Sequence, residues 1–206
     1  WRQTASYLSN LKEVQTTTWR LTDVNHQKVM GITDGAAPRV FSCMTAMLGI
    51  LLSRYAQQDQ FYLHLADLEG KKSTDIVPVL FAPGASLSLR QYLNETQESL
   101  AKSYLSGDEA KSTTTSSNTY ITSVQLHPGS APDATYDLAF TIDLSAEQNI
   151  SLAVQYNPQC FQDTFLRRAE RQLNRLMEAL EDMSGLIGEM EILPAEELSM
   201  LEAFNH

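Results

Sequence analysis

The fold of this chain is decided by residues 136–180, YDLAFTIDLSAEQNISLAVQYNPQCFQDTFLRRAERQLNRLMEAL. Apolar side chains alternate with polar or small ones over 136–143 and again over 150–156, and this alternation predicts two half-buried strands. The short connection from Ser145 to Asn149 predicts that the strands pair as an antiparallel hairpin. Helical spacing then places one apolar stripe on a helix over 161–181. The stripe comprises Phe161, Phe165, Ala169, Leu173, Leu176 and Leu180.

Strands and helices alternate upstream of this stretch. Runs rich in β-branched and apolar residues predict strands over 16–21, 61–66, 76–82 and 119–126. Segments of helical period predict helices over 1–14, 23–31, 38–57 and 87–105. Asp23 is the expected N-cap of the second helix, and Pro78 indicates a strand at the edge of a sheet. The helix over 38–57 is apolar around most of its circumference, which predicts a central place in the core.

These elements predict an α/β fold with two layers, in which helices cover a mixed sheet that contains an antiparallel hairpin. With 206 residues and 43% apolar residues the chain can bury a sizeable core. We therefore assign residues 1–193 to one domain and residues 194–206 to the start of a linker. The polar tract from Ser112 to Ser117 predicts a mobile loop inside the domain.

The composition argues against several partners. A formal net charge of −10 disfavours nucleic acid and anionic membranes, since both carry negative charge. The longest apolar run, Val40 to Leu52, is shorter than the roughly 20 residues that a membrane-spanning helix needs. The two cysteines, Cys43 and Cys160, show neither disulfide nor metal-site spacing, which predicts a reduced, cytoplasmic protein without a bound metal or cofactor.

No residue of this chain is predicted to be catalytic. The serine-nucleophile motif Gly-x-Ser-x-Gly does not occur in the sequence. Gly70-Lys-Lys-Ser-Thr74 lacks the earlier glycine of a phosphate-binding loop, because Leu65 stands there. His64 is the histidine inside a predicted strand, where a structural role is favoured over that of a general base.

Short motifs occur in a fixed order along nearly the whole chain. They are Trp1-Arg-Gln, Leu52-Ser-Arg-Tyr through Asp59, Tyr136-Asp-Leu138, Val154-Gln-Tyr-Asn157 with Phe161, and Glu191-Ile-Leu-Pro194. In this order they resemble the C-terminal lobe of a condensation domain from a nonribosomal peptide synthetase. Each lobe of that family has the fold of chloramphenicol acetyltransferase. The family is an acyltransferase class that forms amide bonds in a tunnel between two lobes, entered by the phosphopantetheine arms of carrier domains.

The resemblance also implies partners. The catalytic His-His-x-x-x-Asp-Gly segment belongs to the first lobe and does not occur here, so the chain is expected to be inactive alone. Implied partners are the first lobe, peptidyl or aminoacyl carrier domains with their phosphopantetheine, and an adenylation domain that follows the linker over 194–206. An isolated lobe is expected to expose apolar surface and to form a homodimer.

Two groups of residues are candidate sites. By the resemblance, Thr122, Ser123 and Gln125 lie on the strand beside the tunnel, where they would hydrogen-bond the amides of the arm. The alternative is ordinary strand polarity that faces solvent.

The second candidate site is basic. Arg168, Arg171 and Arg175 share one helix face in an acidic chain, which suggests a docking surface for an acidic carrier domain. The alternative is local neutralisation of this face by Glu170, Glu178 and Glu181.

Departures from the family leave two further interpretations open. A Gly-x-Phe-Val-Asn segment and a Gln-Asp-x-Pro-Phe-Glu motif are absent, and the tract Ser112 to Ser117 stands in place of the second. One interpretation is a noncatalytic, vestigial condensation-like unit that serves as an interaction or scaffold module. The other is the same lobe of an epimerisation or cyclisation domain.

Overall fold

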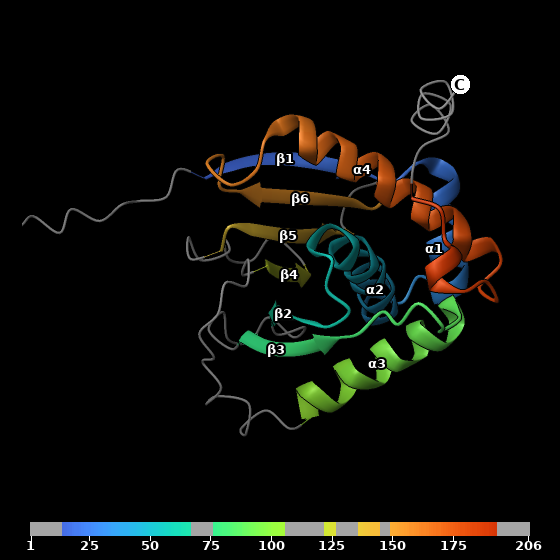
Figure 1. Cartoon of the computed structure of the whole chain (residues 1–206). Coiled ribbons are helices and arrows are strands. Elements are labelled where there is room, and N and C mark those ends of the chain that lie inside the picture. The colour runs from blue at the N-terminus through green and yellow to red at the C-terminus, as the bar shows by residue number, and fades with distance from the viewer. Residues whose placement is uncertain (1–13, 67–75, 106–121, 127–135, 145–148, 193–206) are drawn as a thin grey trace, which may run out of the picture.

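The computed structural model describes residues 14–66, 76–105, 122–126, 136–144 and 149–192 (Figure 1). Its strands are β1 (Gln15–Arg20), β2 (Phe61–Ala66), β3 (Ile76–Phe81), β4 (Thr122–Leu126), β5 (Leu138–Asp143) and β6 (Ser151–Tyr156). They form one six-stranded sheet in the order β1-β6-β5-β4-β2-β3. β4 pairs in parallel with β5 and β2, and the other neighbours are antiparallel. The predicted mixed sheet is confirmed, and Pro78 does lie on an edge strand.

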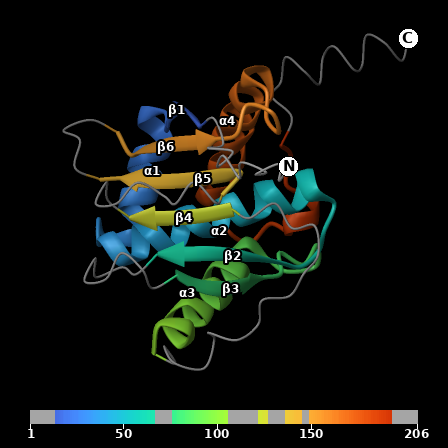
Figure 2. The same cartoon turned by 90° about the vertical axis from the view of Figure 1, so that its left-hand side faces the viewer.

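Helices form the second layer. They are α1 (Asp23–Thr33), α2 (Ala37–Ala56), α3 (Leu89–Leu105) and α4 (Asp163–Glu178), followed by the short 3-10 helices η2 (Ala179–Glu181) and η3 (Ile187–Glu189). Figure 2 looks onto the sheet with these helices behind the strands, so they cover one of its faces. We call the other face of the sheet the open face. The predicted tract over 112–117 and linker over 194–206 lie outside the described residues, as does nearly all of the predicted helix over 1–14.

The residues at the two ends of α1 explain where this helix begins and ends. The N-cap of α1 is Thr22, whose hydroxyl accepts the backbone N–H of Asn25, so the expected cap Asp23 occupies the first helical position instead. The helix also runs two residues beyond the expected Gly31, to Thr33. Asp34 and Gly35 then take left-handed φ angles of 52° and 64°, which ends the helix.

Helix α2 is the centre of the core. Its side chains from Val40 to Leu51 are buried almost without interruption, as its apolar circumference predicted. Three groups of residues pack around it in one cluster. They are Leu63, Leu65, Val79, Phe140, Ile142, Leu152 and Val154 from the sheet, Leu89, Tyr92 and Leu100 from α3, and Leu166, Leu173 and Leu176 from α4.

The hairpin of β5 and β6 has the predicted antiparallel pairing, from Leu138 opposite Tyr156 to Asp143 opposite Ser151. Its open end is fastened by Asn157, which donates its backbone N–H to the carbonyl of Asp137 and its side-chain amide to the Asp137 carboxylate at 3.1 Å. The predicted alternation fails in one respect, because Ala139 and Thr141 are as buried as their apolar neighbours. They are small residues in a central strand, where the longer Gln155 stands beside Ala139.

Asn174 on α4 ties edge strand β1 to the helical layer. Its side-chain amide donates to the carbonyl of Arg20, and its side-chain oxygen accepts the backbone N–H of Thr22, both at 3.0 Å. The side chain of Asn25 donates to both oxygens of Asn174. The end of β1 and the start of α1 are therefore fixed by one amide on a helix that lies about 150 residues later.

The segment over 183–190 lies along the segment that leads into α3. Backbone hydrogen bonds join Arg90 to Met183, Leu89 to Gly185 and Gly188 to Ala85. Arg54, near the end of α2, donates its guanidinium to the carbonyls of Ile187 at 2.5 Å and Met190 at 2.6 Å. Burial lowers the pKa of Arg54, but the pKa of an arginine is so high that the guanidinium stays cationic. Its hydrogen bonds to the two carbonyls are therefore charge-assisted.

We predict that Arg54→Met destabilises the protein and loosens this segment. Two carbonyls lose a charged donor, so the free energy of unfolding in urea should fall by about 2 kcal/mol. Amide hydrogen exchange over 187–190 should accelerate more than exchange in β5. The control is Arg167→Met, which removes an exposed ion pair to Asp163 and should change stability by less than about 1 kcal/mol. Equal effects of the two substitutions would contradict the role of Arg54.

A second prediction concerns Gly49 in α2. A Cβ at this position would lie 2.7 Å from the Tyr92 hydroxyl oxygen and 3.1 Å from Cδ1 of Phe81. Gly49→Ala should therefore destabilise the protein by about 1 kcal/mol, because overpacking outweighs the better helix propensity of alanine. The double variant with Tyr92→Phe should regain most of that loss.

The matched control for Gly49 is Gly31→Ala in α1. A Cβ at Gly31 would meet nothing within 4 Å, so this substitution should stabilise the protein by about 0.5–1 kcal/mol. Urea unfolding of the three variants and the natural chain measures all these effects. Stabilisation by Gly49→Ala would show that α2 and α3 are not packed as closely as the structure has them.

Candidate functional site

The three predicted tunnel residues lie on β4, in the interior of the sheet between β5 and β2. Ser123 pairs with His64 on β2 and with Ala139 on β5, and Gln125 pairs with Thr141. Successive residues of a strand face opposite sides of the sheet. Leu63 and Leu65, on either side of His64, are in the core, so His64 lies on the open face. Its partner Ser123, and Gln125 two residues further along β4, are therefore also positions of the open face.

The register separates the third tunnel residue from the other two. Thr122 pairs with Leu138, which packs in the core. The sheet therefore brings Ser123 and Gln125 together on its open face and assigns the position of Thr122 to a row on the covered face.

His64 is half-buried on the open face. Its Nδ1 atom lies 3.3 Å from the hydroxyl oxygen of Tyr136, and the two rings meet edge to face with centroids 5.8 Å apart. Burial lowers the pKa of His64 below its usual value, so the imidazole is neutral at pH 7. Among the residues that the structure describes, no carboxylate contacts this ring as the orienting group of a general base would. The geometry agrees with the structural role expected for His64.

Large apolar side chains are exposed at one end of the open face. Tyr62 on β2 and Leu80 on β3 are directly paired, and they are 55% and 44% exposed. Sequence analysis did not single them out, although the alternation of Tyr62 and His64 with Leu63 and Leu65 is the signal that would have done so. The opposite end, on β1, exposes Thr16, Thr18 and Arg20 instead.

The arginines of α4 fall into two groups. Arg168 and Arg171 are exposed, whereas the side chain of Arg175 is only 35% exposed. Arg175 binds the carboxylates of Glu178, closely, and of Glu191, at 3.3 Å. Burial alone would lower the pKa of Arg175, but these carboxylates outweigh it and raise the pKa. Arg175 is therefore held in an ion-pair network that includes the segment after η3.

Two of the expected neutralising acids contact residues outside α4. Glu170 accepts the backbone N–H of Arg20 at 2.9 Å, and Glu181 pairs with Lys28 at 3.0 Å. Glu178 is the acid that binds Arg175.

Metal binding and thiol chemistry find little support in the described part of the chain. No three His, Cys, Asp or Glu side chains there form a group that could hold a metal ion. Cys43 and Cys160 are free thiols, and burial raises the pKa of Cys43 to about 12, which leaves it protonated and unreactive.

Among the described residues, none of the helices is both long and apolar enough to span a membrane.

No family model matches the sequence, and no curated protein matches it. Solved structures do match the fold. A four-domain nonribosomal peptide synthetase bound to AMP and glycine gives a TM-score of 0.76 at 13% identity, over 90% of this chain and 18% of that one. The X-domain in complex with OxyB from teicoplanin biosynthesis gives 0.67 at 18% identity, over 89% and 49%. A mutant of the starter condensation domain of rhizomide synthetase, in complex with C8-CoA, gives 0.68 at 16% identity, over 87% and 48%.

The chain thus has the condensation-domain fold, the two-layer fold that its motifs predicted. It spans about half the length of the single condensation and X-domains that it matches, as one of two lobes would. This half agrees with the C-terminal lobe expected from the order of its motifs.

We predict a pH-dependent contribution of His64 to stability. Its pKa is lower in the folded than in the unfolded protein, so the unfolded state binds the proton more readily. The contribution is fully present above the unfolded pKa of about 6.5 and is lost as the pH falls toward the folded pKa. The free energy of unfolding should therefore decrease less between pH 7.5 and 5.5 in His64→Gln than in the natural chain. Identical pH dependence in both proteins would contradict the burial of this ring.

Proposed function

We propose that this chain is the C-terminal lobe of a condensation-type domain in a nonribosomal peptide synthetase, where it helps to form the tunnel for amide bond formation. The supporting observation is the fold match over 87–90% of the chain to about half of a condensation domain or X-domain. The motif order along the sequence supports the same assignment. The catalytic histidine would come from the first lobe, so the chain would be inactive alone and would act by positioning substrate.

In this proposal the open face is turned toward the first lobe and the phosphopantetheine arm of a carrier domain. Ser123 and Gln125 would offer hydrogen bonds to the amides of the arm, because their register positions lie on that face. Thr122 is the least suited of the three tunnel candidates, since its row includes the core residue Leu138. Tyr62 and Leu80 would be covered by the first lobe, or by a second copy in a homodimer of the isolated chain.

Carrier docking is assigned to the basic face of α4. Arg168 and Arg171 are exposed and would meet the acidic surface of a carrier domain or the phosphate of its arm. Arg175 is only 35% exposed and binds the carboxylates of Glu178 and Glu191, so docking through it would require those ion pairs to rearrange. The same assignment places an adenylation domain after residues 194–206 and the whole assembly in the cytoplasm.

A noncatalytic interaction module is the second candidate. The X-domain from teicoplanin biosynthesis, which is 18% identical to this chain and shares its fold, was solved in complex with another protein, OxyB. The absent Gly-x-Phe-Val-Asn and Gln-Asp-x-Pro-Phe-Glu segments also favour a lobe whose surface is used for binding. An epimerisation or cyclisation domain would use the same lobe and differs in its first-lobe motifs.

The first test is the intact mass of the native polypeptide from its source cells, with peptide mapping upstream of Trp1. We expect a longer chain that contains His-His-x-x-x-Asp-Gly. In that full polypeptide, Ser123→Trp should lower the rate of amide formation between two carrier-bound substrates by about tenfold or more, because a bulky side chain displaces the arm. Glu98→Trp, at an exposed position of α3, is the control and should leave the rate unchanged.

The outcomes separate the candidates. Loss of rate in Ser123→Trp alone, with an unchanged unfolding midpoint, supports the tunnel role. An unchanged rate in Ser123→Trp would overturn that role. A native chain that begins near Trp1 would overturn the catalytic assignment and leave the interaction module, which co-purification of a separate partner protein would then identify.

A further inference from the structure

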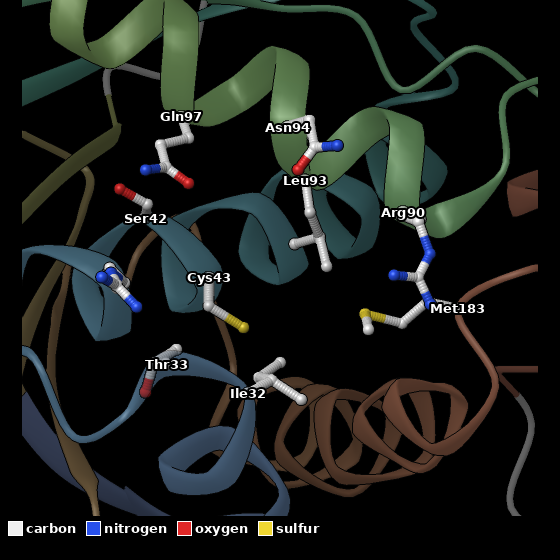
Figure 3. A pocket seen from close by; sticks show the side chains of 10 residues that line it. Ile32, Thr33, Ser42, Cys43, Arg90, Leu93, Asn94, Gln97 and Met183 are labelled. Atoms are coloured by element: carbon white, nitrogen blue, oxygen red, sulfur yellow. The ribbon is translucent and has the colours of Figure 1, made fainter.

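A cavity of about 230 Å³ opens in the helical layer, away from the open face of the sheet (Figure 3). Its walls come from four parts of the chain that only the fold brings together. They are the end of α1, the start of α2, the first half of α3 and the segment after η2. None of the candidate tunnel residues contributes to it. The cavity is therefore a separate site from the one assigned above.

The lining has an apolar part and a polar part. The apolar part comprises Ile32, Cys43, Leu93 and Met183, and the polar part comprises Thr33, Arg39, Ser42, Arg90, Asn94 and Gln97. The thiol of Cys43 belongs to the apolar wall, because burial keeps it protonated. In Figure 3, Arg90 and Met183 lie at one end of the cavity, and Ser42 and Gln97 lie toward the other.

The two arginines of the cavity differ in their partners. Arg39 is already paired with the carboxylate of Asp34 at 2.5 Å. Arg90 uses its backbone N–H to bind the carbonyl of Met183, but no hydrogen bond or ion pair of the described residues reaches its guanidinium. Asp182 is near enough to feel its charge without contacting it. One guanidinium at one end of the cavity thus has donors to offer to an anionic ligand.

Size restricts the ligand further. A cavity of roughly 150 Å³ suffices to hold benzene, and drug-sized ligands occupy roughly 300–1,000 Å³. A volume of 230 Å³ therefore suits a molecule of about ten heavy atoms. The apolar walls favour an aromatic or branched body, and the sulfur of Met183 makes favourable contacts with an aromatic ring.

We propose that this cavity binds a small monocarboxylate with an aromatic or branched apolar body. Its carboxylate accepts hydrogen bonds from Arg90, and its body lies between Leu93, Ile32 and Met183. Gln97 and Ser42 supply hydrogen bonds to polar substituents at the other end (Figure 3). A singly charged group fits one unpaired guanidinium, and a phosphate, with more negative charge, would call for the second arginine that Asp34 already holds.

The test uses phenylacetate as the probe and residues 1–206, with binding followed by calorimetry and by saturation-transfer NMR. Asn94→Trp, at an exposed position on the rim, should abolish binding by filling the cavity. Arg90→Gln should weaken binding about tenfold, the factor that corresponds to one charge-assisted hydrogen bond. The control Arg167→Gln also removes an exposed guanidinium, but on α4, and should bind like the natural chain.

A neutral analogue separates charge from apolar contact. The natural chain should bind 2-phenylethanol about tenfold more weakly than phenylacetate. The Arg90→Gln variant should bind the two probes with equal affinity. If Asn94→Trp fails to fold by circular dichroism, Gln97→Trp on the same rim replaces it. No binding of phenylacetate, binding that survives the tryptophan substitution, or equal binding of the two probes to the natural chain would each overturn the proposal.

Discussion

The rest of the structure depends on the burial of one helix, α2. Its side chains over 40–51 are buried almost without interruption, so the sheet, α3 and α4 must each present apolar surface to it. Close packing leaves little tolerance at such a position, since interiors have the density of organic crystals. Gly49 marks the tightest approach, where Tyr92 and Phe81 occupy the space of a side chain. Near the C-terminal end of the same helix, Arg54 binds two carbonyls of the segment that follows α4 and so holds that segment in place.

The motif residues that carried the family resemblance hold the ends of elements together. Arg54 binds the carbonyls after η2, Asp137 and Asn157 close the open end of the hairpin, and Phe161 packs against Phe165 at the start of α4. The first two contacts join segments that are apart in the sequence, whereas the third is local to the start of α4. The strand register pairs none of them with Ser123 or Gln125. The motifs therefore support the fold strongly and the tunnel chemistry only through the family.

Sequence periodicity predicted the helices and strands. It did not predict features that depend on tertiary contacts, such as the burial of a polar residue or the face on which a strand residue lies. The hairpin and the helices over 38–57 and 87–105 were predictable, because each has a clear period and turn residues at its ends. The burial of Thr141 was not, because it depends on the neighbours of a central strand rather than on its own polarity. The difference between Thr122 and Ser123 also required the pairing register, since one residue along a strand changes the face. The partner of Arg175, Glu191, lies beyond the helix, and the cavity needs four separate segments.

The uneven surface of the open face limits how a partner can cover it. The end at β2 and β3 exposes Tyr62 and Leu80, the middle holds the small residues Ala139 and Thr141, and the end at β1 exposes Thr16 and Arg20. Removal of apolar area from water is the main gain of association, so a partner lobe gains most at the β2 and β3 end. Ala139 and Thr141 in the middle are only 3% and 6% exposed, so the part of this face that a partner can contact lies toward its two ends.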